Sequence, residues 1–187
     1  MLQAPEGRPS LSLSNDRKDN DATSFSISPW GGTYRVGNHA VVFPAHSVCE
    51  PSTSNYAAKQ WDAPCAAATS AIEVNAVVRK DGARTWVDFS PALRFVPSAN
   101  PKEWVWLFLR TPEAKHATGD LARFNILYAE SIGGVTVNDA AGDVTLRTYV
   151  DTHKGSTFRR IKHFSGYLGT SGFVCDPNTE CSGEPAP

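Results

Sequence analysis

Short segments of alternating polar and apolar residues, separated by glycine and proline turns, constrain this chain more than any other feature. Residues 23–28 and 72–78 alternate with the period of a strand that buries one face. The Gly31-Gly32 pair permits backbone conformations with positive φ, and Pro91 interrupts a strand because proline cannot donate to a ladder. Turn signals recur at intervals of roughly 8–12 residues, the spacing of a sandwich or barrel. The pattern predicts an all-β fold, an antiparallel β-sandwich.

Further elements follow from the same pattern. Residues 104–109 are so continuously apolar that they predict a central strand buried on both faces. The Gly37-Asn38 pair predicts a tight hairpin, and the polar stretch 111–120 suits a short turn of helix. Residues 45–70 form a long loop, which is unusual in a compact domain unless it is functional or pinned. The remaining expected strands are 34–36, 39–43, 85–89, 93–95, 124–128, 135–137, 144–150 and 157–164.

The length of 187 residues suits one domain with extensions. We expect a polar arm at 1–22, the sandwich at 23–170 and a tail at 171–187. The composition of the arm cannot bury enough surface to fold alone. Either its own domain or another chain must therefore hold it.

The charge balance excludes some classes of partner. The formal net charge is −1, so nothing in the composition draws the chain toward nucleic acid or anionic lipid. No stretch has the apolar length of a transmembrane segment. Residues 1–6 are polar and do not resemble a signal peptide. Either a leader has been removed, or export uses another route, or the thiols are reduced in the cytoplasm.

The four cysteines fall as two pairs in the sequence, Cys49 with Cys65 and Cys175 with Cys181. Four cysteines permit three connectivities, and the sequence does not choose among them. Local pairing is preferred because both intervals are loops that can bend back. Neither spacing matches the Cys-x-x-Cys pairs that are typical of zinc sites, so no metal is expected. Disulfides favour an oxidising, extracytoplasmic location, periplasmic or secreted.

Four short segments of the chain occur in the order in which one known family of domains carries them. Residues 25–33 carry the Gly-Gly turn, and 41–44 form an apolar strand that ends at a proline. Residues 89–95 supply a Phe-Ser-Pro stretch, and 163–167 a closing strand. Together these segments resemble the ZU-five domain, a module of ankyrins, the netrin receptor and zonula occludens protein with bacterial exported relatives. Residues 45–47 depart from the run of small residues that usually follows the proline.

That family is a β-sandwich used mainly for contact with other protein domains, so the resemblance implies a binding or assembly role. Several relatives also cut themselves between Phe and Ser of a His-Phe-Ser sequence, present here as His163, Phe164 and Ser165. In such a reaction Ser165 Oγ attacks the carbonyl carbon of Phe164, and His163 is the natural base or positioning group. The alternative is a plain strand end with Phe164 inward and His163 outward.

Other candidate residues have more ordinary interpretations. The five histidines show no paired metal spacing. The tryptophans fit a core by their pattern, except that Trp61 lies beside Tyr56 in the long loop, where an exposed aromatic would be a contact anchor. Arg160 and Lys162 share one strand face, which suits an acidic partner or a phosphate. A solvated face is nevertheless the usual place for such charges.

The expected function is a non-enzymatic, cofactor-free sandwich that binds or braces other protein subunits, with the arm, the long loop and the tail as its contact elements. We expect an accessory subunit of an extracytoplasmic or membrane-surface assembly. Two alternatives stay open. One is a self-cleaving module cut between Phe164 and Ser165. The other is a carbohydrate-binding β domain that uses loop aromatics.

Overall fold

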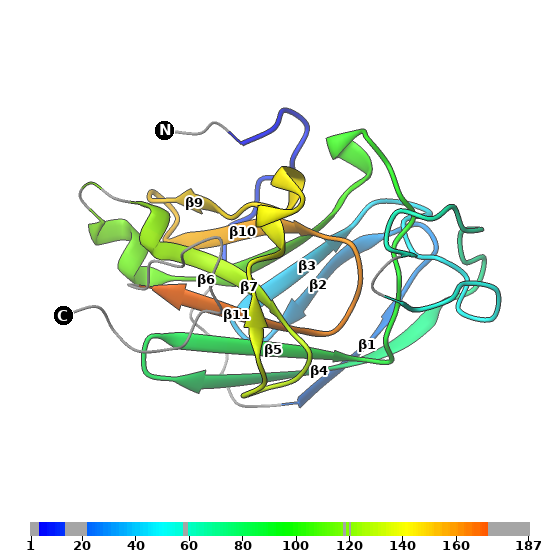
Figure 1. Ribbon diagram of the computed structural model, residues 1–187, viewed down its shortest axis with the longest axis horizontal. Coiled ribbons are helices and arrows are strands. Elements are labelled where there is room, and N and C mark those ends of the chain that lie inside the picture. Colours follow the sequence, from blue (N-terminus) through cyan, green and yellow to red (C-terminus); the bar gives the residue numbers. More distant parts are fainter. Residues whose placement is uncertain (1–3, 14–21, 58–59, 118, 120, 172–187) are drawn as a thin grey trace.

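The computed structural model describes residues 4–13, 22–57, 60–117, 119 and 121–171. These residues form two antiparallel sheets packed together, so the predicted β-sandwich is confirmed (Figure 1). The six-stranded sheet has the order β1-β4-β5-β11-β7-β8, and the five-stranded sheet has the order β2-β3-β6-β10-β9. The strands are β1 (Ala22–Ile27), β2 (Gly32–Val36), β3 (His39–Phe43), β4 (Ile72–Asp81), β5 (Arg84–Ser90), β6 (Val105–Arg110), β7 (Phe124–Ala129), β8 (Thr136–Val137), β9 (Tyr149–Asp151), β10 (Ser156–Ile161) and β11 (Gly166–Ser171).

The helical segments of the described residues are short 3₁₀ turns. They are η2 (Pro101–Glu103), η3 (Pro112–His116), η4 (Leu121–Arg123), η5 (Asp139–Ala141) and η6 (Val144–Leu146). The turn η3 confirms the helical turn predicted within 111–120. The predicted strand 144–150 is wrong in its first half, because the Asp143 side chain caps η6 by accepting from the Thr145 amide.

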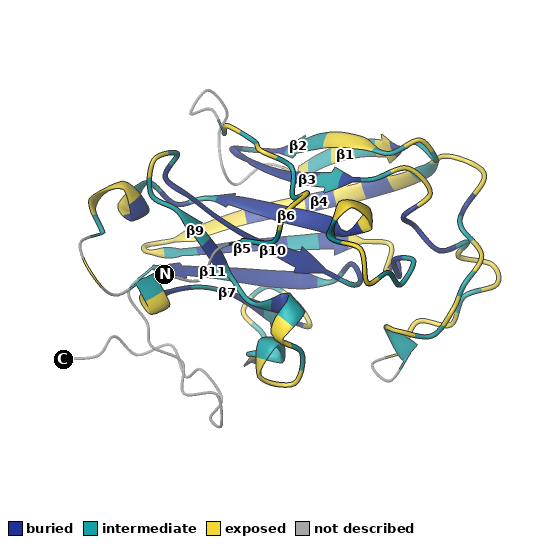
Figure 2. Ribbon diagram, turned by 90° about the horizontal axis from the view of Figure 1, so that it is seen from above, coloured by how far each residue is buried: buried dark blue, intermediate teal, exposed yellow. Residues whose placement is uncertain are grey.

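The main core lies between the two sheets, where alternate residues of each strand point inward. From the five-stranded sheet β6 contributes Val105, Leu107 and Leu109, and from the other sheet β4 contributes Val74 and Val78. Burying each such side chain contributes roughly 1.5–3 kcal/mol. Figure 2 shows β6 and β10 buried along nearly their whole length, whereas β4 exposes one face. The prediction of a central strand buried on both faces is therefore confirmed for β6.

The N-terminal arm covers the outer face of the five-stranded sheet. That face carries an aromatic cluster made of Trp104, Trp106, Phe108, Tyr149 and Phe158. Ala4, Leu11 and Leu13 pack against the cluster, and the guanidinium of Arg8 lies 4.9 Å from the centre of the Phe158 ring. Residues 4–13 are therefore held by their own domain.

The basic residues near β10 do not form a solvated face, so that expectation is wrong. Arg159 is 1% exposed, Arg160 is 7% exposed and the Lys162 side chain is 10% exposed. Arg159 makes two hydrogen bonds of 2.7 Å with the carboxylate of Asp139. Arg160 lies over the ring of Trp104, 4.3 Å from its centre. Burial is tolerated because each charge has a partner.

Trp30 is not in the core, contrary to the pattern-based expectation for the tryptophans. It is 75% exposed at the turn between β1 and β2, where its ring meets His46 edge-on at 5.0 Å. Trp86, Trp104 and Trp106 are buried as expected.

Two connections meet at one end of the sandwich. Residues 162–165 carry the chain from β10 in one sheet to β11 in the other, so the predicted strand 157–164 is wrong beyond Ile161 (Figure 1). The long loop between β3 and β4 is closed by a disulfide between Cys49 and Cys65, which confirms that pairing. The loop folds over the crossover, and the His-Phe-Ser sequence lies in that crossover.

Candidate functional site

The crossover segment is anchored on both sides of the Phe164–Ser165 peptide bond. Phe164 is fully buried and its ring stacks on Phe89 at 4.2 Å, so the predicted inward direction is confirmed. The Phe164 amide donates to the carbonyl of Leu93 at 2.7 Å. On β11, the Tyr167 hydroxyl donates to the carbonyl of His163 at 2.6 Å. The fold therefore holds His163 and Phe164 in place on one side of this bond and joins them to Tyr167 on the other side.

His163 is buried, so the expectation that it points outward is wrong. Its ring stacks on Trp61 at 3.9 Å and meets Tyr128 edge-on at 5.2 Å. Burial lowers the pKa of His163 from 6.5 to about 4, and the nearby Asp139 carboxylate only partly opposes this shift. The imidazole is therefore neutral near pH 7, which is the form that accepts a proton.

Three polar groups lie together beside the Phe164–Ser165 peptide bond. His163 Nδ1 lies 3.2 Å from Ser165 Oγ and 3.2 Å from the hydroxyl oxygen of Tyr56. The Tyr56 hydroxyl donates its single proton to the carbonyl oxygen of Phe164 at 2.5 Å. In the tautomer that carries its proton on Nε2, His163 Nδ1 can accept a hydrogen bond from the Ser165 hydroxyl. The arrangement thus places a hydroxyl, a neutral imidazole and a hydrogen-bond donor at one peptide bond, and these are the kinds of group that nucleophilic cleavage of an amide requires.

Tyr56 and Trp61 both turn toward this crossover. The Tyr56 ring meets Trp61 edge-on at 4.8 Å, and Trp61 lies half-buried against His163. Tyr56 keeps 40% of its surface exposed. Burial raises the pKa of Tyr56 to about 12, so its hydroxyl remains a donor at neutral pH.

Arg160 and Lys162 make their polar contacts within the chain. Lys162 Nζ lies 2.6 Å from Asp143 and 2.6 Å from Asp62, and Arg160 donates to the hydroxyl of Thr145 at 2.8 Å. Burial alone raises the pKa of Asp143, but hydrogen bonds from Lys162 and Thr145 outweigh it and lower that pKa to about 2. The acidic partners expected for this face are therefore internal carboxylates.

Several residues around the site could not be chosen from the sequence. Tyr128 faces His163 because it pairs with Tyr167 across β7 and β11. Arg94 is 3% exposed and donates to the carbonyls of Gln60 and Ala63 in the long loop. These contacts depend on strand register and on the path of the loop, and neither leaves a local signal in the sequence.

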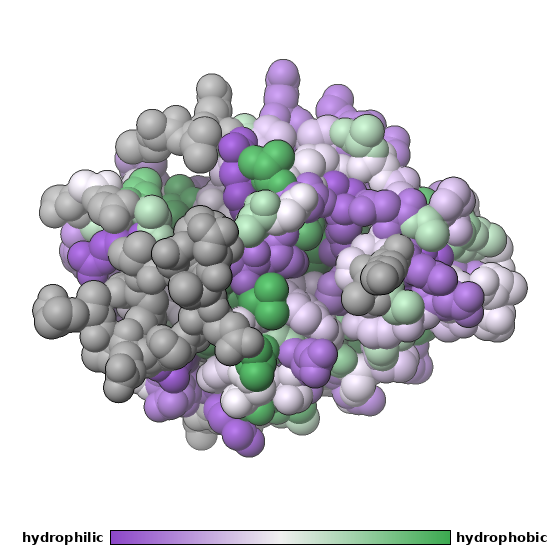
Figure 3. Space-filling view, viewed as in Figure 1, coloured by the Kyte–Doolittle hydropathy of each residue, from purple (hydrophilic) through white to green (hydrophobic). Residues whose placement is uncertain are grey.

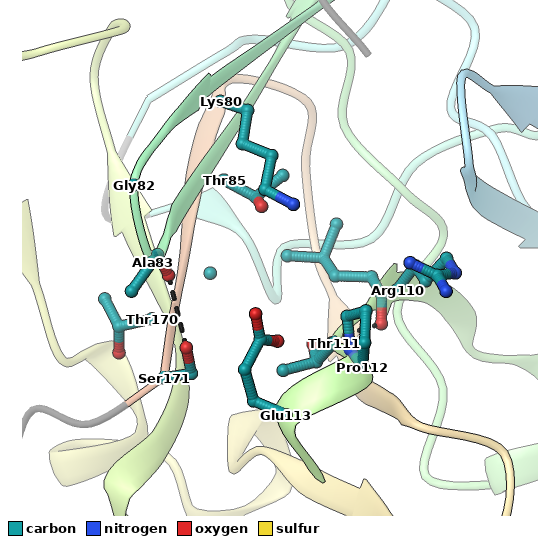
Figure 4. Close-up of a pocket in the computed structure, with 12 residues that line it drawn as sticks. Lys80, Gly82, Ala83, Thr85, Arg110, Thr111, Pro112, Glu113, Thr170 and Ser171 are labelled. Carbon is teal, nitrogen blue, oxygen red and sulfur yellow. Dashed lines mark hydrogen bonds between the residues drawn. The ribbon is translucent and has the colours of Figure 1, made fainter. Parts of the chain in front are cut away.

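Other surface features lack the same convergence of groups. A polar hollow near the start of η3 is lined by Lys80, Arg110 and Glu113 among others, and it has room for about one water molecule (Figure 4). The face in Figure 3 carries isolated apolar side chains among polar ones. The hollow is too small to hold a substrate.

Within the described ranges, no group of three or more His, Cys, Asp or Glu side chains is placed to hold a metal ion. No helix in that part of the chain is long and apolar enough to cross a bilayer. Cys175 and Cys181 lie outside the described residues. No protein-family model, characterised protein or solved structure matches the chain, so its resemblance to the ZU-five domain stays a prediction.

Proposed function

We propose that this protein is a self-cleaving β-sandwich that cuts its own chain between Phe164 and Ser165. The observation that carries the proposal is the contact of the Tyr56 hydroxyl with the Phe164 carbonyl, next to the contact between Ser165 and His163. The Tyr56 hydroxyl donates to its oxygen at 2.5 Å, and Ser165 Oγ lies 3.2 Å from a neutral His163. Plain strand ends do not need a buried histidine, a neighbouring hydroxyl nucleophile and a donor on one carbonyl.

The chemistry proceeds in two balanced steps. Ser165 Oγ attacks the carbonyl carbon of Phe164 while its proton moves to His163 Nδ1, and the Tyr56 hydroxyl stabilises the oxyanion. The C–N bond then breaks, and the proton passes to the nitrogen of Ser165, which leaves an ester. Water adds to the ester carbonyl and Oγ leaves with a proton. One water is consumed, and the products are the Phe164 carboxylate and the Ser165 amine.

The new fragment remains part of the sheet. It begins with β11, which pairs with both β5 and β7. These ladders do not depend on the severed bond, so the two chains stay together under native conditions and separate under denaturing ones.

Intact mass and denaturing electrophoresis of the full chain test the proposal. We expect two fragments, one ending at Phe164 and one starting at Ser165, with a total mass that has gained one water. Ser165→Ala gives one full-length chain, whereas the matched control Ser171→Ala on β11 cleaves normally. Hydroxylamine attacks the ester and leaves a hydroxamate on Phe164. A folded wild-type chain that stays full-length on prolonged incubation refutes self-cleavage.

A second candidate function is binding to another protein subunit in an extracytoplasmic or membrane-surface assembly. Trp30 supports it, because it is 75% exposed on a turn and tryptophan is enriched in interface hot spots. The Cys49–Cys65 disulfide supports a location outside the reducing cytoplasm.

Site-specific photocrosslinking tests this second candidate in the native host cell. A photoreactive residue at position 30 gives one discrete adduct, whereas the same residue at the exposed position 73 of β4 gives none. Equal labelling from both positions contradicts a specific contact at Trp30.

A further inference from the structure

The loop closed by Cys49 and Cys65 supplies two of the side chains around the proposed cleavage site, Tyr56 and Trp61. Tyr56 in this loop donates to the Phe164 carbonyl oxygen, and Trp61 stacks on the His163 ring at 3.9 Å. From the other side His163 faces Tyr128 and Tyr167, which lie on β7 and β11. One half of the site therefore belongs to fixed strands and the other half to a loop.

Apart from the disulfide, other contacts hold the base of this loop and the part of it that follows Gln60. Cys49 bridges to Ala67, and Arg94 donates to the carbonyls of Gln60 and Ala63. Lys162 pairs with Asp62, whose side chain is 70% exposed, so solvent screens that ion pair. Residues 51–57 are largely exposed. The covalent link therefore carries much of the restraint on Tyr56.

The disulfide joins cysteines 16 residues apart. A disulfide that closes a loop of about this length restricts the open chain and so lowers its entropy. This shifts the equilibrium toward the closed loop by on the order of a hundredfold. The contacts of Tyr56 with the Phe164 carbonyl and of Trp61 with the His163 ring are made by the disulfide-closed loop.

We propose that the Cys49–Cys65 disulfide is a redox switch for the self-cleavage site. The oxidised loop holds Tyr56 and Trp61 in place and permits cleavage, and the reduced loop releases them and stops it. The inference rests on the proposed self-cleavage and adds its regulation. A thiol reductant converts the disulfide to two thiols and is itself oxidised to a disulfide, and glutathione disulfide reverses the exchange. Cleavage is thereby delayed until the chain reaches an oxidising compartment.

The test uses the full chain with Cys175→Ser and Cys181→Ser, so that only one disulfide can form. The protein is prepared reduced and then either kept in dithiothreitol or oxidised with glutathione disulfide. Cleavage is followed by electrophoresis and intact mass, and circular dichroism checks the fold in both arms. We expect oxidation to speed cleavage at least about tenfold. The matched control, Cys49→Ser with Cys65→Ser, stays slow in both arms.

Two further measurements separate the switch from loss of folding. Tyr56→Phe keeps the disulfide but removes the donor, and we expect it to slow cleavage of the oxidised chain at least about tenfold. In a Ser165→Ala chain, which cannot cleave, NMR titration of the His163 imidazole shows the pKa rising toward 6.5 on reduction, because water reaches the ring.

The possible results distinguish the redox switch from self-cleavage itself. Equal cleavage rates in the two arms overturn the switch and leave self-cleavage standing. A His163 pKa that is unchanged by reduction, or a Tyr56→Phe chain that cleaves at the full rate, also overturns the switch. Absence of cleavage in both arms overturns both proposals.

Discussion

Removal of the Asp139 carboxylate tests the ion pair of the buried Arg159. Arg159 is 1% exposed, and its guanidinium makes two hydrogen bonds of 2.7 Å with Asp139 and a third of 2.7 Å with the Ile126 carbonyl. Asp139→Ala leaves a buried charge with carbonyl acceptors alone, which costs about 3–5 kcal/mol in a dry interior. The Asp139 side chain is 23% exposed, so water reaches the vacated position. We therefore expect Asp139→Ala to lower the free energy of unfolding by about 3 kcal/mol, the lower end of this range.

Denaturant and thermal unfolding measure this cost in a Ser165→Ala chain, so that a single polypeptide unfolds. A loss of about 3 kcal/mol lowers the midpoint temperature by about 6–12 °C for a protein of this size. Asp81→Ala, an exposed carboxylate on β4, is the matched control and changes stability by less than about 0.5 kcal/mol.

A second variant distinguishes an unpaired charge from a lost contact. Replacing both partners, as Asp139→Ala with Arg159→Met, removes the charge and keeps apolar volume, so most of the lost stability returns. The reasoning is refuted if Asp139→Ala costs less than about 1 kcal/mol, or if the double variant is no more stable than the single one.

Three further predictions follow from the described contacts. Since the pKa of His163 falls from 6.5 unfolded to about 4 folded, its contribution to stability is present above pH 6.5 and is lost as pH falls toward 4. A Ser165→Ala chain should lose about 2 kcal/mol between about pH 7 and pH 5 in urea unfolding, and the same loss in a His163→Gln derivative contradicts this assignment. Gly31→Ala should cost more than about 2 kcal/mol, because φ is 77° and a Cβ would clash with the Phe43 carbonyl oxygen. Gly82→Ala, with φ of 55° and nothing within 4 Å of its Cβ, should cost only about 1 kcal/mol, and equal midpoints for the two variants disprove the steric argument. Trp30→Ser should change stability by less than about 0.5 kcal/mol in thermal unfolding, and a larger loss shows that its ring packs more tightly than its exposure implies.

Much of the fold could be predicted because its signals are local. Alternation marked β4, the Gly37-Asn38 pair marked the hairpin between β2 and β3, and the continuous apolar run marked β6. The strand predicted at 144–150 was wrong in its first half, where a side chain stabilises a helical turn instead of a strand. The cap from Asp143 turned the start of a predicted strand into η6, and no count of apolar residues reveals such a cap.

The candidate site could be predicted only in part. His163, Phe164 and Ser165 are adjacent in the chain, so a sequence motif can point to them. Tyr56 is 107 residues from His163, and the 3.2 Å contact between them exists because the disulfide-closed loop folds over the crossover. The direction of His163 was wrong because it lies between strands of different sheets, where strict alternation no longer applies.

The sequence by itself determined the two-layer β architecture, because strand periodicity and turn chemistry act over a few residues. It also determined the pairing preference of Cys49 with Cys65. Only the tertiary structure decided that Arg159 is buried beside Asp139 and that Tyr56 reaches the Phe164 carbonyl. Burial and partnership of polar groups depend on which strands become neighbours, and that is a property of the whole packed chain rather than of any segment.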